Sequence, residues 1–213
     1  MMTKISVGEM LKRPYGITSE KFGHVESAEV LLEAGFKGIQ VRCERSTPTR
    51  RIMEIADRVA DLAEPWGALV IVNNDVMAAR DSKADGVHLG QEDARVETAN
   101  LILKNKIIGV SVSTPAQAMT AQNEGATYLS AGLAYNSRTK PCGDVIGPGG
   151  IRNIKRFTNL PVIAIGGIRL WGLTEMHGTG IDSVAVMSDI YEALDPVGRA
   201  KEIERAWREL RRA

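Results

Sequence analysis

Short apolar runs alternate with longer polar segments along the whole chain. The run ALVIVNN at 68–74 is typical, because it is rich in Val and Ile and ends in polar residues. Runs of this length and composition, bounded by Gly, Pro or polar residues, are typical of buried strands. We predict strands at 15–19, 37–42, 68–74, 86–89, 107–111, 128–132, 161–167 and 183–188.

Between these runs, apolar residues recur at spacings of three and four, as in Ile52, Ile55 and Val59. This spacing predicts helices that bury one face. The predicted helices are Ser27–Ala34, Thr47–Ala63, Val76–Asp81, Arg95–Lys104, Pro115–Glu124, Pro148–Phe157, Leu170–His177 and Pro196–Arg212. Regular alternation of strand and helix indicates parallel βα units.

Eight such units in 213 residues predict an α/β fold with a single (β/α)8 TIM barrel. We expect one domain over residues 1–213, with a short N-terminal extension of about 14 residues before the first strand. An open doubly wound sheet is the alternative, but no Gly-x-Gly-x-x-Gly follows the first strand to favour it. The longest irregular segment, 136–150, is predicted to be a mobile loop over a site.

Charge and composition narrow the classes of partner. Lys plus Arg number 27 and Asp plus Glu number 26, so we expect no nucleic-acid or membrane partner. The apolar runs are too short to span a bilayer, and no signal peptide precedes them, so we expect a cytoplasmic protein. Cys43 and Cys142 form no metal-type spacing and fit a reduced compartment. A homo-oligomer is left open.

Polar side chains gather where the predicted strands end. In barrels of this class the active site lies at the C-terminal ends of the strands. On the second strand, the period of two places Gln40 and Arg42 on the same face. The other candidate positions at or after strand ends are Asn74, Asp75, Asp93, Ser111, Ser137, Thr139, Lys140, Gly167, Met187 and Ser188.

The two aspartates indicate a metal. Asp75 and Asp93 each precede a predicted helix, and a helix N-cap worth about 1 kcal/mol would explain either one alone. Both together, on neighbouring strands with Asn, Arg and Lys nearby, favour a shared cation. Hard oxygen ligands beside phosphate-binding groups predict Mg²⁺, bound by Asp75 and Asp93.

A second signal comes from the glycines after the seventh predicted strand. Gly166 and Gly167, and the stretch AVMSDI after the eighth strand, lie where such barrels often bind phosphate through backbone N–H groups. A tight turn without a ligand is the alternative. His88 is predicted to be a hydrogen-bonded core histidine, and His24 and His177 are expected at the surface.

The sequence thus predicts two phosphate regions. One is assisted by a metal near strands two to five, and the other is metal-free near strands seven and eight. A reaction that joins two small phosphorylated molecules would use both.

Eight motifs together resemble the thiamine-phosphate synthase family. They are YGIT, QVR, VNND, GVHLGQED, IGVS, SRTK, PVIAIGGI and AVMS, and they cover about Tyr15 to Ile190 in the family's order. The resemblance implies a transferase that joins hydroxymethylpyrimidine diphosphate to thiazole phosphate, releasing pyrophosphate and forming thiamine phosphate. The implied chemistry is a Mg²⁺-assisted dissociative substitution without a protein nucleophile.

The resemblance also implies roles for individual residues. Asp75 and Asp93 would hold Mg²⁺ on the diphosphate. The pyrimidine and its diphosphate would be bound by Gln40, Arg42, Asn74, Ser111 and Lys140, of which Arg42, Ser111 and Lys140 would act in catalysis. Ser137 and Thr139 would contact the thiazole, and its phosphate would lie at Gly167 and the backbone of Met187 and Ser188.

Two departures from the family pattern stand out. The family motif Gln-x-Arg-x-Lys reads Gln40-Val41-Arg42-Cys43-Glu44 here, so an acid stands where a diphosphate-binding lysine is expected. We predict that Arg45, Arg50 or Arg51 supplies the missing charge; an ordinary solvated helix start is the alternative. Ser137 keeps a hydroxyl where the family usually has Thr.

Two other functions compete with the synthase. A thiazole tautomerase-like isomerase of the same superfamily needs no diphosphate site, and Glu44 favours it slightly. A non-catalytic paralogue that binds thiamine phosphate would show neither Mg²⁺ dependence nor pyrophosphate release.

Overall fold

The computed structural model describes residues 5–136 and 144–212. Within them, each strand pairs in parallel with the next, and β1 also pairs with β8, so that the sheet closes. The strands are β1 Tyr15–Ile17, β2 Gly38–Val41, β3 Leu69–Asn73, β4 Gly86–Leu89, β5 Ile107–Val112, β6 Tyr128–Ala131, β7 Val162–Ala164 and β8 Ser183–Val186. The predicted (β/α)8 barrel is confirmed.

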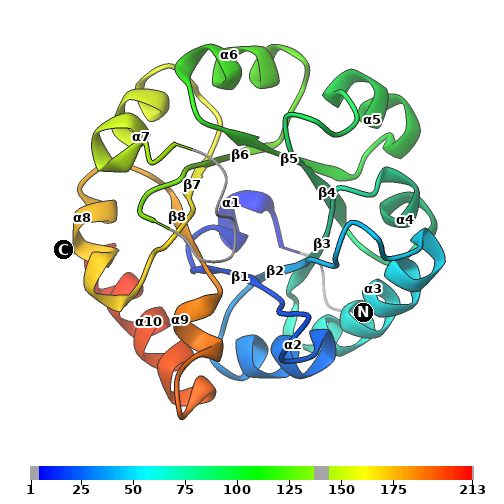
Figure 1. The fold of residues 1–213 in the computed structure, drawn as a ribbon, viewed down its shortest axis with the longest axis horizontal. Coiled ribbons are helices and arrows are strands. Elements are labelled where there is room, and N and C mark those ends of the chain that lie inside the picture. Colours follow the sequence, from blue (N-terminus) through cyan, green and yellow to red (C-terminus); the bar gives the residue numbers. More distant parts are fainter. Residues whose placement is uncertain (1–4, 137–143, 213) are drawn as a thin grey trace.

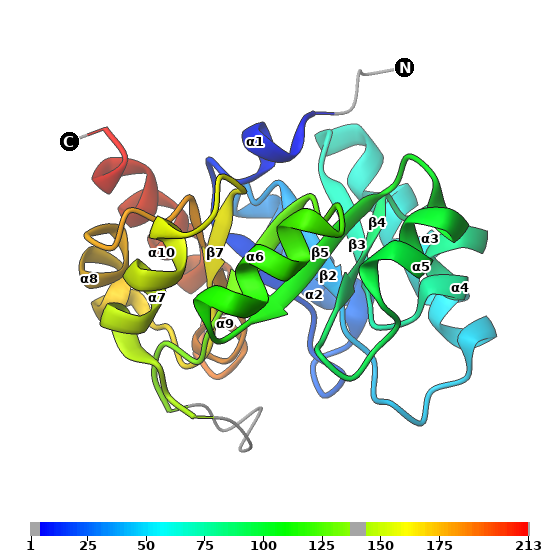
Figure 2. The ribbon, with the colours of Figure 1, turned by 90° about the horizontal axis from the view of Figure 1, so that it is seen from above.

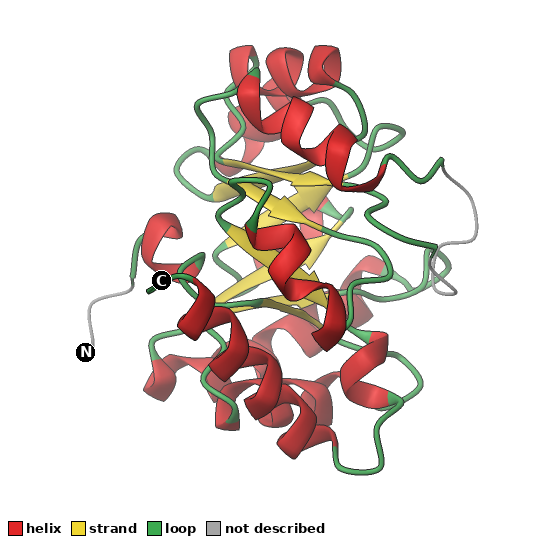
Figure 3. Cartoon of the chain, turned by 90° about the vertical axis from the view of Figure 1, so that its left-hand side faces the viewer, coloured by secondary structure: helices red, strands yellow, loops and turns green. Residues whose placement is uncertain are grey.

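Helices surround the barrel, as Figure 1 shows along its axis and Figure 3 shows from the side. They are α2 His24–Glu33, α3 Thr49–Ala63, α4 Val76–Asp81, α5 Val96–Leu103, α6 Pro115–Asn123, α7 Gly147–Arg156, α8 Leu173–His177, α9 Ser188–Tyr191 and α10 Pro196–Leu210, whereas α1 Val7–Met10 lies over one end of the barrel (Figure 1, Figure 2). Two 3₁₀ turns, η1 Glu64–Trp66 and η2 Leu170–Gly172, join them. Among the described residues, no helix is both long and apolar enough to cross a membrane.

Several strands end earlier than the apolar runs predict, and β1, β7 and β8 do so by two or three residues. The run at 161–167 continues past β7, but Gly166 and Gly167 have φ of 100° and 64° and so leave the extended conformation. The run at 183–188 stops at Val186, and Ser188 already begins the short helix α9. Hydrophobicity alone does not reveal where the backbone turns.

The N-terminal extension closes one end of the barrel. It contains helix α1, whose Met10 and the following Leu11 are 1% exposed. Both pack in an inner apolar cluster with Tyr15 of β1 and Tyr128 of β6. Figure 2 shows α1 at one end of the barrel, above the strands. The periodicity does not predict this helix, because it is a single turn.

A second, larger apolar cluster fills the layer between the strands and the surrounding helices. It includes Leu31 of α2, Val59 of α3 and Trp207 of α10, all of which are buried. These helices therefore bind the barrel through the apolar stripes that their sequences predict. The clusters leave the opposite end of the barrel to polar residues.

Candidate active site

Parallel strands point the same way, so the segments that follow them emerge at one end of the barrel. We call this end the rim. The described residues that were predicted for the site all lie on or just after a strand. They are Gln40 and Arg42 at β2, Asn74 and Asp75 after β3, Asp93 after β4, Ser111 in β5, Gly167 after β7, and Met187 and Ser188 after β8.

Gln40 and Arg42 come from the end of β2. Gln40 is 3% exposed, and its Nε2 donates a 3.4 Å hydrogen bond to the Tyr15 hydroxyl. The Arg42 backbone N–H donates to Thr18 Oγ1 at 3.2 Å. The Arg42 side chain is half-buried, and its guanidinium has no hydrogen-bond or carboxylate partner in the described part of the chain. Burial lowers the pKa of Arg42 from its ordinary value.

Asn74 and Asp75 link β3 to α4. Asn74 has a φ of 69°, a left-handed conformation that Asn tolerates better than most residues. Its N–H donates to the His88 carbonyl of the neighbouring strand at 2.8 Å. Asp75 is the N-cap of α4: its Oδ1 accepts from the Ala78 N–H at 2.8 Å, and its Oδ2 accepts from the Thr49 hydroxyl at 2.7 Å.

Asp93 closes the turn after β4. Its side chain is 5% exposed, and Oδ2 accepts from the Gly90 N–H at 2.7 Å. Oδ1 lies 3.2 Å from Nη1 of Arg45, whose side chain is 68% exposed. The N-cap of α5 is Arg95, so the N-cap alternative describes Asp75 and is wrong for Asp93.

The two carboxylates share a pattern. In each, one oxygen is fixed by a backbone N–H and the other faces an exposed side chain, Thr49 for Asp75 and Arg45 for Asp93. An exposed hydroxyl or guanidinium can move away at little cost in free energy. Each aspartate can therefore offer one oriented oxygen to a cation.

Ser111 leads into a chain of hydrogen bonds that crosses the barrel. Its Oγ lies 2.9 Å from His88 Nε2, and His88 Nδ1 lies 3.0 Å from the Tyr128 hydroxyl. The Tyr128 hydroxyl lies 3.0 Å from that of Tyr15, which accepts from Gln40. The chain thus joins two predicted substrate-binding residues, Ser111 and Gln40, through the core.

The prediction that His88 is a hydrogen-bonded core residue is confirmed, since it is 4% exposed. The sequence pattern does not reveal its contact with Ser111. Burial raises the pKa values of Tyr15 and Tyr128 above the ordinary tyrosine range, so both hydroxyls stay protonated at neutral pH.

The segment after Arg42 contains Glu44, the acid that stands where the family motif has a lysine. Glu44 is exposed. Arg50 and Arg51 each lie 3.2 Å from Glu54 on their own helix, α3, whereas Arg45 reaches Asp93 at the rim. Of the three candidate arginines, only Arg45 contacts a predicted site residue among the described side chains.

Glycines shape the rim after β7. A Cβ on Gly167 would lie 2.4 Å from the Asn136 carbonyl oxygen, and one on Gly166 would lie 2.7 Å from Leu133. The segment after β6 therefore packs directly on these glycines. The tight-turn alternative accounts for part of their role, because the backbone requires them even without an anion.

Met187 and Ser188 form the junction of β8 with α9. Met187 is the N-cap of α9, and Ser188 is its first residue. The next residue, Asp189, is 8% exposed; it accepts from the Leu170 N–H at 2.9 Å and contacts Arg169 at 3.3 Å. These bonds tie the connections after β7 and β8 together.

Three predicted residues, Ser137, Thr139 and Lys140, lie outside the described residues, as does much of the predicted mobile loop at 136–150. Their assignments stay predictions.

Two features of the rim were not predicted. His24, expected at the surface, is 8% exposed, because Thr18 and Glu20 fold over its ring. Tyr135 contacts Trp171 with the two rings tilted and their centroids 4.9 Å apart, and its hydroxyl donates to Glu175. The only sign of the contact between Tyr135 and Trp171 in the sequence is that both residues are aromatic.

Comparison with known proteins adds to this geometry. The model of the thiamine monophosphate synthase family matches residues 14–190. The chain belongs to this family. The match begins just before β1 and ends within α9, so it spans every strand of the barrel.

Individual family members match over nearly their whole length. A thiamine-phosphate synthase of Caldivirga maquilingensis is 38% identical over 92% of this chain and 96% of the relative. The solved thiamine phosphate pyrophosphorylase of Pyrococcus furiosus is 36% identical, with a TM-score of 0.87 over 94% of this chain and 98% of that one. A 3-hexulose-6-phosphate synthase, 18% identical with a TM-score of 0.70, shares the fold alone.

Proposed function

We propose that the protein is a thiamine-phosphate synthase. It joins hydroxymethylpyrimidine diphosphate to thiazole phosphate, giving thiamine phosphate and pyrophosphate. Membership of the family and the full-length likeness to its named synthases support this reaction. The free thiol of Cys43 and the phosphorylated substrates fit a cytoplasmic location.

The observation that carries the proposal is the charge pattern at the rim of β2 to β4. Arg42 is half-buried without a carboxylate partner, and such a cation is stabilised when an anion binds beside it. Asp75 and Asp93 follow the next two strands. Two carboxylates that can bind a cation, near an arginine that can bind an anion, suit a diphosphate that carries a metal ion.

The donor set fits Mg²⁺. This ion is commonly held by one or two carboxylates and completes its shell with water and phosphate oxygens. Asp75 and Asp93 would each contribute the oxygen that now faces Thr49 or Arg45, while the backbone N–H keeps the carboxylate oriented. When bound, Mg²⁺ would neutralise charge that develops on the departing pyrophosphate.

The protein's own residues would bind and orient the reactants. In the proposed dissociative substitution, the bond between the hydroxymethyl carbon and the diphosphate oxygen breaks. The pyrimidine delocalises the resulting cation, and the thiazole nitrogen then forms the new C–N bond. Arg42 would stabilise the leaving diphosphate, and Gln40, Asn74 and Ser111 would hold the pyrimidine. Ser111 is itself oriented by His88 at 2.9 Å.

Arg45 would replace the family lysine that is Glu44 here. It already approaches the rim, where it contacts Asp93, whereas Arg50 and Arg51 are held by Glu54. With a cation held by Asp93, the exposed Arg45 side chain would be free to bind the diphosphate instead. Asp93 would then be neutralised by the metal ion, and Arg45 by the diphosphate.

The thiazole side would use the residues that the family resemblance assigns. Ser137 and Thr139 would contact the ring, Lys140 would bind the diphosphate between the two substrates, and the backbone at Gly167, Met187 and Ser188 would surround the thiazole phosphate. The positive φ of Gly167 lets its peptide group turn toward an anion.

A product assay tests the proposal. The purified protein is mixed with both substrates and Mg²⁺, and pyrophosphate and thiamine phosphate are measured. We expect equal amounts of both, and none when either substrate is left out. Isomerisation of the thiazole substrate without pyrophosphate release would favour the tautomerase, and thiamine phosphate binding without turnover would favour the non-catalytic paralogue.

A further inference from the structure

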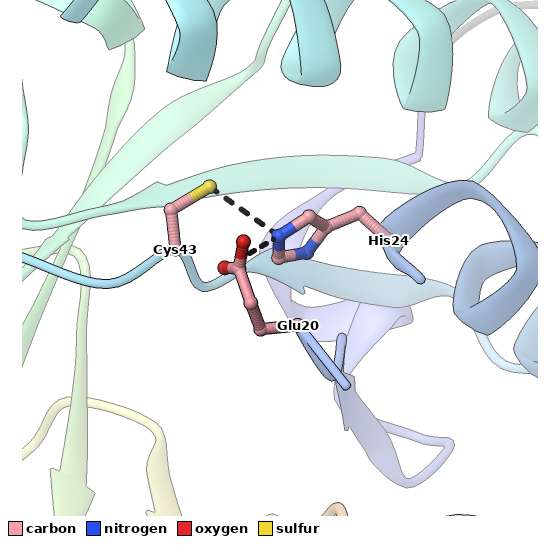
Figure 4. Close-up of side chains that lie close together, drawn as sticks. All are labelled: Glu20, His24 and Cys43. Atoms are coloured by element: carbon pink, nitrogen blue, oxygen red, sulfur yellow. Dashed lines mark hydrogen bonds and ion pairs between the residues drawn. The ribbon is translucent and has the colours of Figure 1, made fainter. Parts of the chain in front are cut away.

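Three side chains with different metal-binding atoms meet beside the ends of β1 and β2. Glu20 lies in the connection between β1 and α2, His24 is the first residue of α2, and Cys43 lies two residues after β2. Their ligand atoms all lie within 4.8 Å of one another. Figure 4 shows the three side chains pointing toward one another. None of the three belongs to the site proposed above.

Both Glu20 and Cys43 approach the same ring nitrogen of His24. Its Nε2 lies 3.0 Å from Glu20 Oε2 and 3.6 Å from Cys43 Sγ. A proton on Nε2 can be donated to only one of them, whereas a cation at the centre contacts all three. In a nucleophilic Cys–His–carboxylate arrangement the acid would instead orient the other nitrogen, Nδ1.

Two of the three separations between ligand atoms are close to those of a zinc site. Tetrahedral Zn²⁺, with Zn–S of about 2.3 Å and Zn–N of about 2.0 Å, separates its sulfur and nitrogen ligands by about 3.5 Å. The observed separation of Cys43 Sγ and His24 Nε2 is 3.6 Å. A carboxylate oxygen and a nitrogen on the same ion would be about 3.3 Å apart, close to the 3.0 Å seen for Glu20.

Neighbouring residues bury the His24 ring and fix its orientation. The ring is 8% exposed, and its Nδ1 lies 2.7 Å from Thr18 Oγ1, which fixes the orientation that a ligating histidine needs. The connection is braced as well: the Ser27 hydroxyl accepts from the Ser19 N–H at 3.1 Å, and the Gly23 N–H donates to the Ser19 carbonyl at 3.0 Å. Glu20, half exposed, leaves an entry path for an ion.

Charge favours a divalent ion. A bound metal lowers the pKa of its thiol ligand and stabilises the thiolate. Thiolate, carboxylate and neutral imidazole together carry two negative charges, which a divalent cation neutralises.

We infer that Glu20, His24 and Cys43 form a second metal site, selective for Zn²⁺ and completed by water. Sulfur, nitrogen and oxygen ligands together suit Zn²⁺ and disfavour Mg²⁺, which prefers oxygen alone. The ion would tie the connection after β1 to the segment after β2. Thr18 links this site to the synthase site, because it also accepts the Arg42 N–H. The inference stands independently of the proposed reaction.

The test uses Co²⁺ as a spectroscopic substitute for Zn²⁺ in the metal-stripped full-length protein. A thiolate ligand gives a sulfur-to-cobalt charge-transfer band, which carboxylate sites lack. We expect this band at one equivalent of Co²⁺, and Zn²⁺ should abolish it by displacement. Cys43→Ser should remove the band, while Cys142→Ser and Asp93→Asn, the matched controls, should retain it.

Two milder variants keep the test decisive if Cys43→Ser fails to fold. Glu20→Gln changes a half-exposed side chain, and Thr18→Val removes the hydroxyl that supports the ring and that also accepts the Arg42 N–H. Each should weaken metal affinity by about tenfold to a hundredfold. The inference is overturned if the unmodified protein gives no charge-transfer band, if the band survives Cys43→Ser, or if Cys142→Ser removes it. Unchanged affinity in both milder variants would also overturn it.

Discussion

The two halves of the rim prepare for phosphate in different ways. After β2 to β4, side chains carry the charge: Arg42, Asp75 and Asp93 stand on short connections and are oriented by backbone N–H groups or strand geometry. After β7 and β8, the backbone itself is arranged, with Gly167 in a left-handed conformation and α9 beginning at Ser188. The first half suits a metal and a diphosphate that must depart, and the second suits a phosphate that is only held.

This difference predicts how each half responds to mutation. Side-chain changes after β2 to β4 should alter chemistry and leave the fold intact. Changes at the glycines after β7 should alter stability as well, because neighbouring segments pack on them.

The largest effect should come from the metal ligands. Asp75→Asn and Asp93→Asn should each lower turnover at least about a hundredfold, since metal stabilisation of a transition state is worth several kcal/mol. EDTA should do the same to the unmodified protein. Steady-state kinetics over a range of Mg²⁺ concentrations measures the effect.

Asn is as good an N-cap as Asp, so Asp75→Asn should preserve α4. The matched control is Asp195→Asn, because Asp195 caps α10 in the same way and is exposed. It should keep full activity. Full activity in EDTA would contradict the metal assignment.

The next effect concerns the glycines after β7. Gly167→Ala combines a left-handed conformation, which costs about 1 kcal/mol, with a clash against the Asn136 carbonyl that costs about 1–3 kcal/mol more. Gly180→Ala is the control, since it has a φ of 83° but nothing within 4 Å of its Cβ. Chemical denaturation should show the larger loss for Gly167→Ala. Equal losses would mean that the close approach of Asn136 is unimportant.

A change at Arg45 tests the replacement of the family lysine. Arg45→Ala should raise the KM for the diphosphate substrate about ten- to a hundredfold, the value of one charge-assisted contact. Arg50→Ala and Arg51→Ala should resemble the parent, because these arginines contact Glu54 instead. A marked gain of activity in Glu44→Lys, with Arg45→Ala unchanged, would show that no arginine has taken the lysine's place.

The smallest effect should come from the hydrogen bonds inside the barrel. Tyr128→Phe removes a hydroxyl that contacts both Tyr15 and His88, and should cost about 1–2 kcal/mol of unfolding free energy. Combined with Tyr15→Phe, the loss should be smaller than the sum of the two single losses, because the two hydroxyls are partners. Additive losses measured by denaturant titration would mean that they are uncoupled.

The sequence pattern was sufficient for the barrel and for the order of its strands, but not for the residue at which each strand ends. Period-two and three-to-four spacings report which faces are buried, so all eight strands were found. These spacings do not report where the backbone turns. The predicted seventh strand therefore ran through Gly166 and Gly167, whereas β7 ends at Ala164. A one-turn helix such as α1 is too short for any period to appear.

Contacts between distant side chains were the main omission. Arg45 meets Asp93 across 48 positions, and His88 meets Tyr128 across 40. Glu20, His24 and Cys43 follow no ligand spacing, and so the sequence pattern gave no sign of them. Such pairs depend on which strands become neighbours, and the linear order of residues does not contain that information directly.

Binding of inorganic pyrophosphate tests the division of the rim most directly. Pyrophosphate resembles the leaving group, and calorimetry can measure its affinity with and without Mg²⁺. Tight binding should require Mg²⁺ and should be lost in Asp93→Asn, while inorganic phosphate should still bind to that variant. Pyrophosphate binding that is equally tight in EDTA, or unchanged in Asp93→Asn, would contradict the account.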